Sequence, residues 1–388
     1  MVHPSKAPSS YRGKWCLLGL LAVLVLWPAA RAQAPGPSRA KALEGQGDLP
    51  GAEQEWRLWL QSNPKDAGAF ASLGVVLSKE QKYGEAAAAY RKAIEIDPKL
   101  PGIHLNLGLA EFKRGDFHAA IDPLRAAVAE SPKNQQARTL LGLSYYAAGR
   151  FEEASEHLKL ASAADPSNPE LHNVLAQSCL TAKKFECALQ EFSWILKQNP
   201  DSASAHMLLG QALDGLKKTQ DAAAEFELAA KADPHAPNVY FGLGFLYWKL
   251  GQFDDAARAL ETQLSLDPDN PQALAYLGDV ELKRNNPEKA LPLLNKAIQK
   301  QQDIRIAYLD LGTIYTDQER YQDALVALQH AEKLAPEQID VHYRLGRLYQ
   351  AMGDPAESRK EFEKVHSLQK KDEDLAGKMT GGNPSPPR

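Results

Sequence analysis

The stretch NVYFGLGFLYWKLGQF, residues 238–253, carries two short signals that recur along this chain of 388 residues. One is the Leu-Gly pair at Leu243 and Gly244, and the other is the Gly-Gln-Phe break that begins at Gly251, which has counterparts in Gly-Asp-Phe at 115–117 and Gly-Arg-Phe at 149–151. The same stretch holds six aromatic residues in 16, whereas the chain as a whole is 8% aromatic. The two signals decide the fold, and the rings raise the question of what they contact.

A period of 34 residues, counted from Ala67, brings equivalent residues into register over 67–372, as nine units without insertion or deletion. Position 8 of the unit is glycine in eight units and alanine in one. Position 20 is alanine in eight units and serine in the last, and position 32 is proline in seven. Position 7 is always leucine: Leu73, Leu107, Leu141, Leu175, Leu209, Leu243, Leu277, Leu311 and Leu345.

Each unit has the length and pattern of two helices joined by a short turn near positions 13–16. Small residues at positions 8 and 20 allow the two helices to approach closely. Proline at position 32 cannot continue a helix, so it ends the second helix before the next unit begins. One such pair cannot bury its own apolar face, but stacked pairs can.

This pattern resembles the tetratricopeptide repeat family over residues 67–372. The resemblance implies an all-α fold, a right-handed superhelical solenoid of helix-turn-helix repeats with a concave and a convex side. Upstream, Ala52, Trp56 and Pro64 keep the same phase, so residues 35–66 are predicted to form a partial N-terminal capping repeat. Residues 373–388, with their Gly and Pro residues, are predicted to be a disordered tail.

Residues 1–34 have the order of a signal peptide: a basic start without acidic residues, an apolar run over 15–27, and small residues after it. Cleavage is expected after Ala32 or Ala34. This predicts an exported protein of bacterial type, periplasmic or secreted, with no membrane insertion after cleavage. The alternative is an uncleaved N-terminal anchor, although the apolar run is shorter than the roughly 20 residues that span a bilayer.

Composition and motifs argue against several classes of function. The formal net charge is −4, so nucleic acid is not an expected partner. The chain has no HExxH zinc motif and no P-loop, and the nine units leave no segment for a catalytic domain. We therefore expect no enzyme, no catalytic residue, no cofactor and no metal. The histidines at position 4 are expected to be structural: His104, His172, His206 and His342.

The aromatic stretch supplies the strongest candidate binding surface. In the family, positions 2, 5, 9 and 12 of the first helix face the concave groove. Phe241, Phe245 and Trp248 occupy positions 5, 9 and 12, so the resemblance places these three rings in the groove together. We expect them to be at least half exposed, as at a binding site. The alternative is that they pack on the neighbouring first helices and are mostly covered.

Other units supply the rest of the predicted groove. It has two apolar zones, separated by a polar zone in unit four and a mixed one in unit five, where Met207 stands beside Gln211 and Asp214. No unit has the Lys at position 5 and Asn at position 9 with which some family members hold a C-terminal carboxylate. The further predicted groove residues are Leu105, Leu109, Phe112, Leu143, Tyr146, Tyr343 and Arg347.

Two cysteines lie within the repeats, Cys179 and Cys187, at positions 11 and 19 of unit four. In an exported protein they can form a disulfide. Position 11 is normally a buried apolar position, so a free buried thiol is the alternative. The separation of the two Cα atoms, below roughly 7 Å for a disulfide, distinguishes the two.

These features predict a non-enzymatic scaffold or adaptor that binds a peptide or helix segment of a protein partner in its concave groove. One alternative is an assembly component of an envelope complex, which would use the convex face or the ends. The other is the regulatory subunit of a carbohydrate- or peptidoglycan-modifying enzyme, with the rings stacking on sugars.

Overall fold

The computed structural model describes residues 36–379, which form twenty helices and no strand. The signal peptide predicted at residues 1–34 lies outside them. The helices fall into two compact units, one ending at Pro101 and one beginning at Gly102. No helix in the described part of the chain is both long enough and apolar enough to cross a membrane.

The first unit contains α1 (Pro37–Gly45), α2 (Leu49–Ser62), α3 (Ala67–Lys79) and α4 (Tyr83–Ile96). The second contains α5 (Ile103–Lys113), α6 (Phe117–Glu130), α7 (Gln135–Ala147), α8 (Phe151–Ala164), α9 (Pro169–Thr181), α10 (Phe185–Gln198), α11 (Ala203–Gly215), α12 (Thr219–Ala232), α13 (Val239–Lys249), α14 (Phe253–Leu266), α15 (Pro271–Lys283), α16 (Pro287–Lys300), α17 (Arg305–Asp317), α18 (Tyr321–Leu334), α19 (Ile339–Ala351) and α20 (Pro355–Met379).

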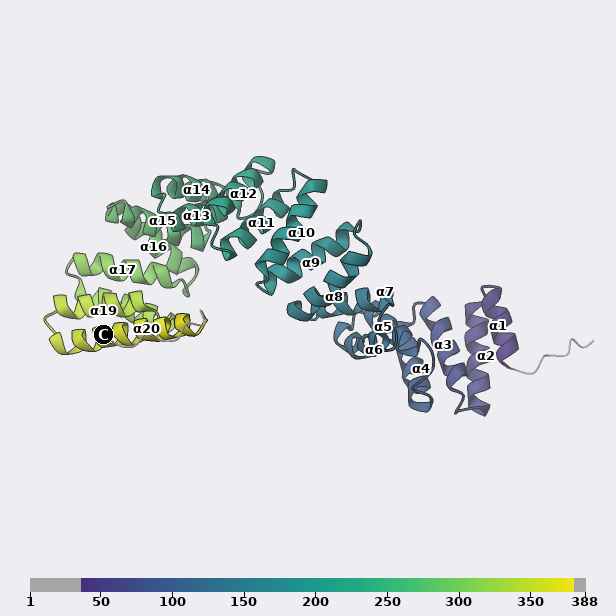
Figure 1. Ribbon diagram of the computed structural model, residues 1–388. Helices are drawn as coiled ribbons and strands as arrows, with labels where there is room; N and C mark the ends of the chain where they lie inside the picture. The colour runs from purple at the N-terminus through teal and green to yellow at the C-terminus, as the bar shows by residue number, and fades with distance from the viewer. Residues whose placement is uncertain (1–35, 380–388) are drawn as a thin grey trace, which may run out of the picture. The chain divides into compact units, whose positions relative to one another are not determined.

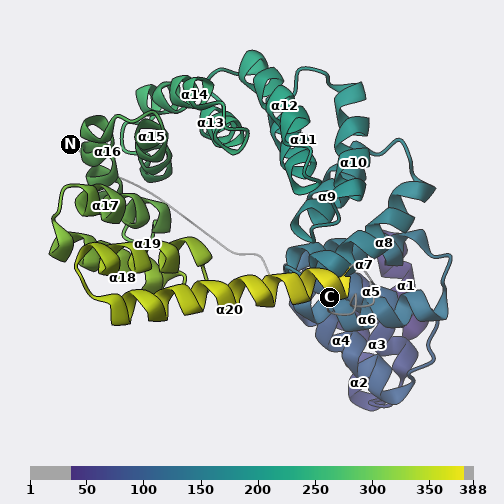
Figure 2. The ribbon, with the colours of Figure 1, turned by 60° about the vertical axis from the view of Figure 1, so that its left-hand side comes forward.

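Consecutive helices pair as antiparallel hairpins, and within each unit a hairpin packs on the next along the chain (Figures 1 and 2). In the second unit most odd-numbered helices also contact the odd-numbered helix of the next hairpin. These first helices therefore follow one another along one side of the unit, and the step from α11 to α13 is the exception. The fold is all-α, a solenoid of helical hairpins, as the repeat predicts.

The 34-residue register of the sequence is the register of the helices. The second helix begins at position 17 in all nine units, and the first helix begins at position 1 in seven. The exceptions are α5 and α13, which begin at position 3. In both, a proline at position 1 is followed by a residue in the left-handed conformation, Gly102 with φ 72° or Asn238 with φ 61°. Glycine and asparagine are the residues that adopt this conformation most readily.

The turn inside each hairpin follows one rule. Position 15 has a positive φ in all nine units, which reverses the chain after the first helix. Four of these residues are glycines, and the other five are Gln81, Lys183, Lys217, Asn285 and Glu319. At the other junction, position 34 often caps the next first helix with its side-chain oxygen. The capping residues are Asp66, Asn134, Asn168, Ser202 and Asn270.

The core of every hairpin is built at positions 7, 8, 20 and 24. The leucines at position 7 are buried, and the alanines at position 20 have no exposed surface. A Cβ atom built on the glycine at position 8 would lie 2.5–3.0 Å from the large side chain at position 24 of the same unit, in all eight units with that glycine. The absence of a side chain at position 8 thus sets how closely the two helices pack.

The chain ends differ from the prediction in one respect. Segment 35–66 contains the hairpin α1–α2, but the tail is not disordered from 373 onward, because α20 continues to Met379. Residues 373–379 contain Glu, Asp, Leu, Ala, Lys and Met, which are compatible with a helix, together with one glycine, Gly377, and no proline. The prolines and the Gly-Gly pair that motivated the prediction lie in 380–388, outside the described residues.

Replacing Gly244 with alanine tests the packing rule. The new Cβ would lie 2.6 Å from Leu260 Cγ and 3.3 Å from Leu260 N, and backbone cannot move aside as a side-chain tip can. We expect Gly244→Ala to lower the free energy of unfolding by about 1–3 kcal/mol, measured by urea denaturation followed by circular dichroism. The control is Gly84→Ala, whose Cβ meets nothing within 4 Å. Equal stability of the two variants would contradict the rule.

Candidate functional site

The ten predicted groove residues all lie on first helices. They come from α5 (Leu105, Leu109, Phe112), α7 (Leu143, Tyr146), α13 (Phe241, Phe245, Trp248) and α19 (Tyr343, Arg347). Tyr343 and Arg347 are exposed, and the other eight are partly buried. Their position on one face is consistent with the expected groove, but their exposure differs from the expectation at α13.

The three rings of α13 are not half exposed, and that prediction is wrong. Phe241, Phe245 and Trp248 are each partly buried because Tyr276 of α15 lies among them. The Tyr276 ring centroid is 5.9, 5.2 and 5.1 Å from theirs, in edge-on geometry. These rings contribute to the packing between two neighbouring repeats, which was the alternative interpretation.

Trp248 also contacts a buried pair of carboxyl groups. Its indole N–H donates to Asp279 Oδ2 at 2.5 Å. Asp279 in turn lies beside Asp310 of α17, and each of the two residues is only 3% exposed. Burial, together with the negative charge of Asp279 and a hydrogen bond to it, raises the pKa of the Asp310 carboxyl well above its usual range. A neutral Asp310 can then donate its proton to Asp279 across the α15–α17 contact.

The hollow part of the first-helix face lies around α11, where three cavities of about 750, 430 and 570 Å³ meet. The first lies between α9 and α11, the second lies between α11 and α13, and the third lies between α11 and the segment 233–237 that precedes α13. Gln211 lines all three, while Met207 and Leu208 each line two. Of the predicted groove residues, Tyr146, Phe241 and Phe245 line these cavities. In units four and five, which contribute α9 and α11, the sequence predicts a polar and a mixed zone of the groove.

Two glycines explain why aromatic rings wall the 430 Å³ cavity, because each glycine lets a ring pack directly against helix backbone. A Cβ atom on Gly215 would lie 2.5 Å from the Phe185 ring, and one on Gly242 would lie 2.1 Å from the Phe226 ring. Both glycines line the cavity, as do both rings. In addition, α11 and α13 contact each other less than the other neighbouring first helices of this unit do. The late start of α13, at Val239 after the left-handed Asn238, accompanies this wider spacing.

Gln211 is the polar centre of this region. Its side chain is exposed, and it makes no hydrogen bond to another described residue. A primary amide offers both a donor and an acceptor, which matches the N–H and C=O groups of a peptide. Its neighbour Asp214, by contrast, is paired with Lys249 and accepts a hydrogen bond from Thr219. Gln211 is therefore available to a ligand where Asp214 is not.

One wall of the cavities is held by a disulfide. Cys179 Sγ of α9 is bonded to Cys187 Sγ of α10, and the two Cα atoms are 5.8 Å apart. The structure thus joins the pair that the sequence left open. Between the cysteines lie Leu180, Thr181, Lys183 and Phe185, and all four line the cavity of about 750 Å³.

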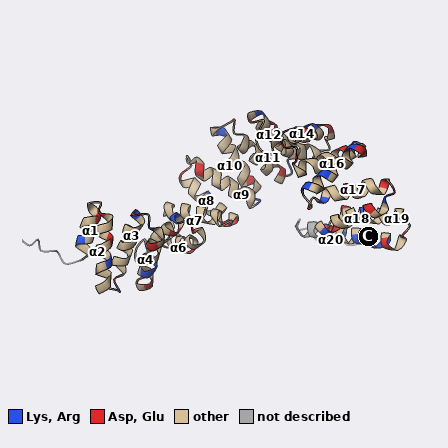
Figure 3. Ribbon diagram, turned by 180° about the vertical axis from the view of Figure 1, so that it is seen from behind, with Lys and Arg blue, Asp and Glu red and all other residues tan. Residues whose placement is uncertain are grey.

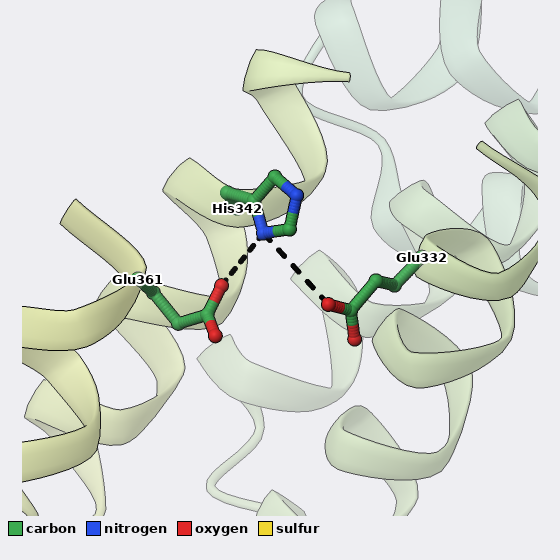
Figure 4. A group of neighbouring side chains, drawn as sticks. All are labelled: Glu332, His342 and Glu361. Atoms are coloured by element: carbon green, nitrogen blue, oxygen red, sulfur yellow. Dashed lines mark hydrogen bonds and ion pairs between the residues drawn. The ribbon is translucent and has the colours of Figure 1, made fainter. Parts of the chain in front are cut away.

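A second cluster of polar groups, Glu332, His342 and Glu361, lies between α18, α19 and α20 (Figure 4). Their nearest ligand atoms all lie within 4.8 Å of one another. However, the ammonium group of Lys364 already lies 3.3 Å from Glu332 Oε1 and 2.8 Å from Glu361 Oε1. A positive charge of the protein itself therefore occupies the position that a cation would need.

The contacts of His342 belong to a pattern of the repeat. In three units the position-4 histidine is buried, with Nδ1 facing a glutamate 19 residues later and Nε2 facing a proline carbonyl six residues earlier. Each of these histidines therefore links the two helices of its hairpin to the turn that precedes them, and this is a structural role. The three sets are His172 with Glu191 and Pro166, His206 with Glu225 and Pro200, and His342 with Glu361 and Pro336.

Charges of both signs are distributed along the helices (Figure 3).

Two family models described as Tetratricopeptide repeat match the chain. One matches 111–178, 215–264 and 315–380, and the other matches 173–237, 241–304 and 279–339. A third, described as TPR repeat, matches 79–111. Together they cover residues 79–380 without a gap.

The chain belongs to the tetratricopeptide repeat family. Tetratricopeptide repeat proteins are typically non-enzymatic interaction modules. No curated protein sequence matches the chain. Among solved structures, it is similar to a tetratricopeptide repeat protein from Parabacteroides merdae, with 19% identity, 64% of this chain and 97% of the other covered, and a TM-score of 0.49.

Two further structures show lower TM-scores. Residues 41 to the end of MamA from Desulfovibrio magneticus match with 25% identity and a TM-score of 0.38, and the match covers 44% of this chain and 96% of the other. Yeast Tom70 matches with 16% identity and a TM-score of 0.40, and the match covers 85% of this chain and 91% of the other. The family assignment therefore rests on the repeat models and on the hairpin register.

Replacing Asp310 with asparagine tests the buried acid pair. The pKa of Asp310 is higher in the folded chain than in the unfolded chain, so its contribution to stability is full below the unfolded value of about 3.9 and is lost as the pH rises through the folded value. An asparagine side chain at this position would keep a neutral donor at every pH. We expect Asp310→Asn to flatten this decline and to raise the free energy of unfolding at pH 7 by about 1–3 kcal/mol.

The measurement is urea denaturation between pH 4 and pH 8. The matched control is Asp317→Asn, at an exposed position of the same helix, α17. A variant at position 310 that is less stable than the wild type at pH 7 would show that the ionised carboxylate is needed there.

Proposed function

We propose that this tetratricopeptide repeat protein is a non-enzymatic scaffold that binds a peptide segment of a protein partner in the groove around α11. The observation that carries the proposal is the meeting of three cavities at Gln211, whose amide has no partner among the described residues. Membership of a family of interaction modules supports the same class of function.

The chemistry of the groove indicates how a peptide would be held. The cavities between α9 and α11 and between α11 and α13 lie on opposite sides of one helix, and packed helices are about 8–10 Å apart. Apolar side chains of the ligand would enter the two, because rings and aliphatic groups line both. Gln211, between them, would bond to the peptide backbone. The apolar side chains in the two cavities would then supply most of the affinity for the peptide, and the Gln211 amide would orient it.

The ring cluster of α13 has a smaller part in this proposal than the sequence suggested. Phe241 and Phe245 line the 430 Å³ cavity, but they also pack against Tyr276. Alanine variants of these rings would therefore disturb the α13–α15 contact as well as the groove. A test of binding needs a residue whose side chain has no role in packing.

Replacing Gln211 with tryptophan provides that test, because the larger side chain would fill the junction of the three cavities. A random library of peptides, each about 12 residues long, is selected on the wild type, and the dissociation constants of the enriched peptides are measured. We expect Gln211→Trp to weaken binding by about tenfold or more, about 1.4 kcal/mol. The control is Gln190→Trp, at an exposed position of α10 that lines none of the three cavities.

Equal binding by the two variants would move the function away from α11. It would favour the alternative of an assembly component that uses the convex face or the ends. Selective binding of glycan fragments in place of peptides would favour the regulatory role in carbohydrate or peptidoglycan chemistry. No feature of the described residues favours either alternative over the groove.

We propose further that the protein is exported, periplasmic or secreted. The support is the signal-like order of residues 1–34 together with the disulfide, since disulfides persist in oxidising compartments. Intact-mass and N-terminal analysis of the protein from its native host is expected to show a chain that begins after Ala32 or Ala34. A chain that retains residues 1–34 in the membrane fraction would support an N-terminal anchor instead.

A further inference from the structure

The disulfide occurs in one repeat only, and that repeat borders the groove. Cys179 and Cys187 are the only cysteines within the repeats, since the third cysteine of the chain is Cys16. The other eight hairpins form the same turn, with a positive φ at position 15, and none of them has a cysteine pair. The hairpin geometry therefore does not require the bond.

The bond closes a short segment that forms the groove wall. Seven residues, 180–186, separate the two cysteines. Phe185 of this segment lines the cavities on both sides of α11, and its ring lies against Gly215. Lys183 adopts a left-handed conformation with φ 57°, which a side chain other than glycine or asparagine adopts less readily. Lys217 of the next unit adopts the same conformation, with φ 63° and no disulfide, so the bond is not needed to form the turn; what it adds is a covalent link between the two ends of the wall segment.

We propose that the Cys179–Cys187 disulfide is a redox switch for the groove: the oxidised form holds the 180–186 wall in its binding conformation, and reduction releases it. The inference rests on the proposed function, because it concerns the same groove. A restrained wall loses less conformational entropy when a ligand binds, so the oxidised form binds more tightly.

A dithiol reductant supplies the chemistry. One of its thiolates bonds to Cys187 Sγ, on the partly exposed cysteine, and the Sγ–Sγ bond breaks with its electron pair passing to Cys179 Sγ, which takes up a proton. The second thiolate of the reductant then displaces Cys187, which leaves as a thiol after protonation. The protein gains two electrons and two protons, and the reductant becomes a disulfide. Cys179, which has no exposed surface, remains as a buried thiol.

The first measurement needs no ligand. 4-Fluorophenylalanine is placed at position 185, or at position 253 as the control, in a chain with Cys16→Ser so that the pair is the only source of thiols. Phe253 is at the same position 17 of a unit without cysteines. We expect dithiothreitol to shift and broaden the fluorine resonance at 185 and to leave that at 253 unchanged. An unchanged resonance at 185 would overturn the proposal, whether or not the groove binds peptides.

The second measurement uses a fluorescent peptide selected on the oxidised protein. We expect the dissociation constant to rise about tenfold on reduction. The double variant Cys179→Ala/Cys187→Ser is expected to bind like the reduced wild type with or without dithiothreitol. Equal affinity of the oxidised and reduced wild type would overturn the switch and leave the groove function standing. If no peptide is selected, the groove function fails, and the fluorine resonance at 185 alone decides whether the bond restrains the wall.

Discussion

The close contact between position 8 and position 24 is the constraint on which the rest of the structure depends. A helix pair in which a large side chain lies directly on a glycine backbone has one favourable separation, and the eight units with that glycine all use it. In unit four Ala176 replaces the glycine, and both it and Phe192 at position 24 stay buried. Because the glycine and the large side chain meet at the same two positions in these eight units, the first helices keep the same register along the repeats.

The repeat made most of the fold predictable. A period of 34 with leucine, glycine, alanine and proline at fixed positions gave the hairpin, the starts of its helices and the buried residues. It did not give the two late starts at α5 and α13, because they depend on a proline followed by a left-handed residue. It also did not give the helix over residues 373–379, since composition alone suggested a tail there.

The candidate site was less predictable, because it depends on contacts between repeats. The rings of α13 are partly covered by Tyr276, a residue at position 6, which the family pattern does not place in the groove. Conversely, the 430 Å³ cavity beside α11 is lined by Gly215 and Gly242, where the absence of a side chain lets aromatic rings pack against the backbone. Both glycines are visible in the sequence, yet only the structure shows that the rings of Phe185 and Phe226 lie against them. Unusual glycines on first helices are therefore the signal that could have located the site.

Both cysteines, the turn between them and the wall residues lie within a single repeat, residues 169–202. Every repeat meets its neighbours through the same helix register, so a repeat is a cassette that can be duplicated, deleted or moved without breaking the array. Recombination at the repeat boundaries would therefore transfer the proposed redox-sensitive element whole into another array. There the same disulfide would restrain one wall of a groove with a different specificity.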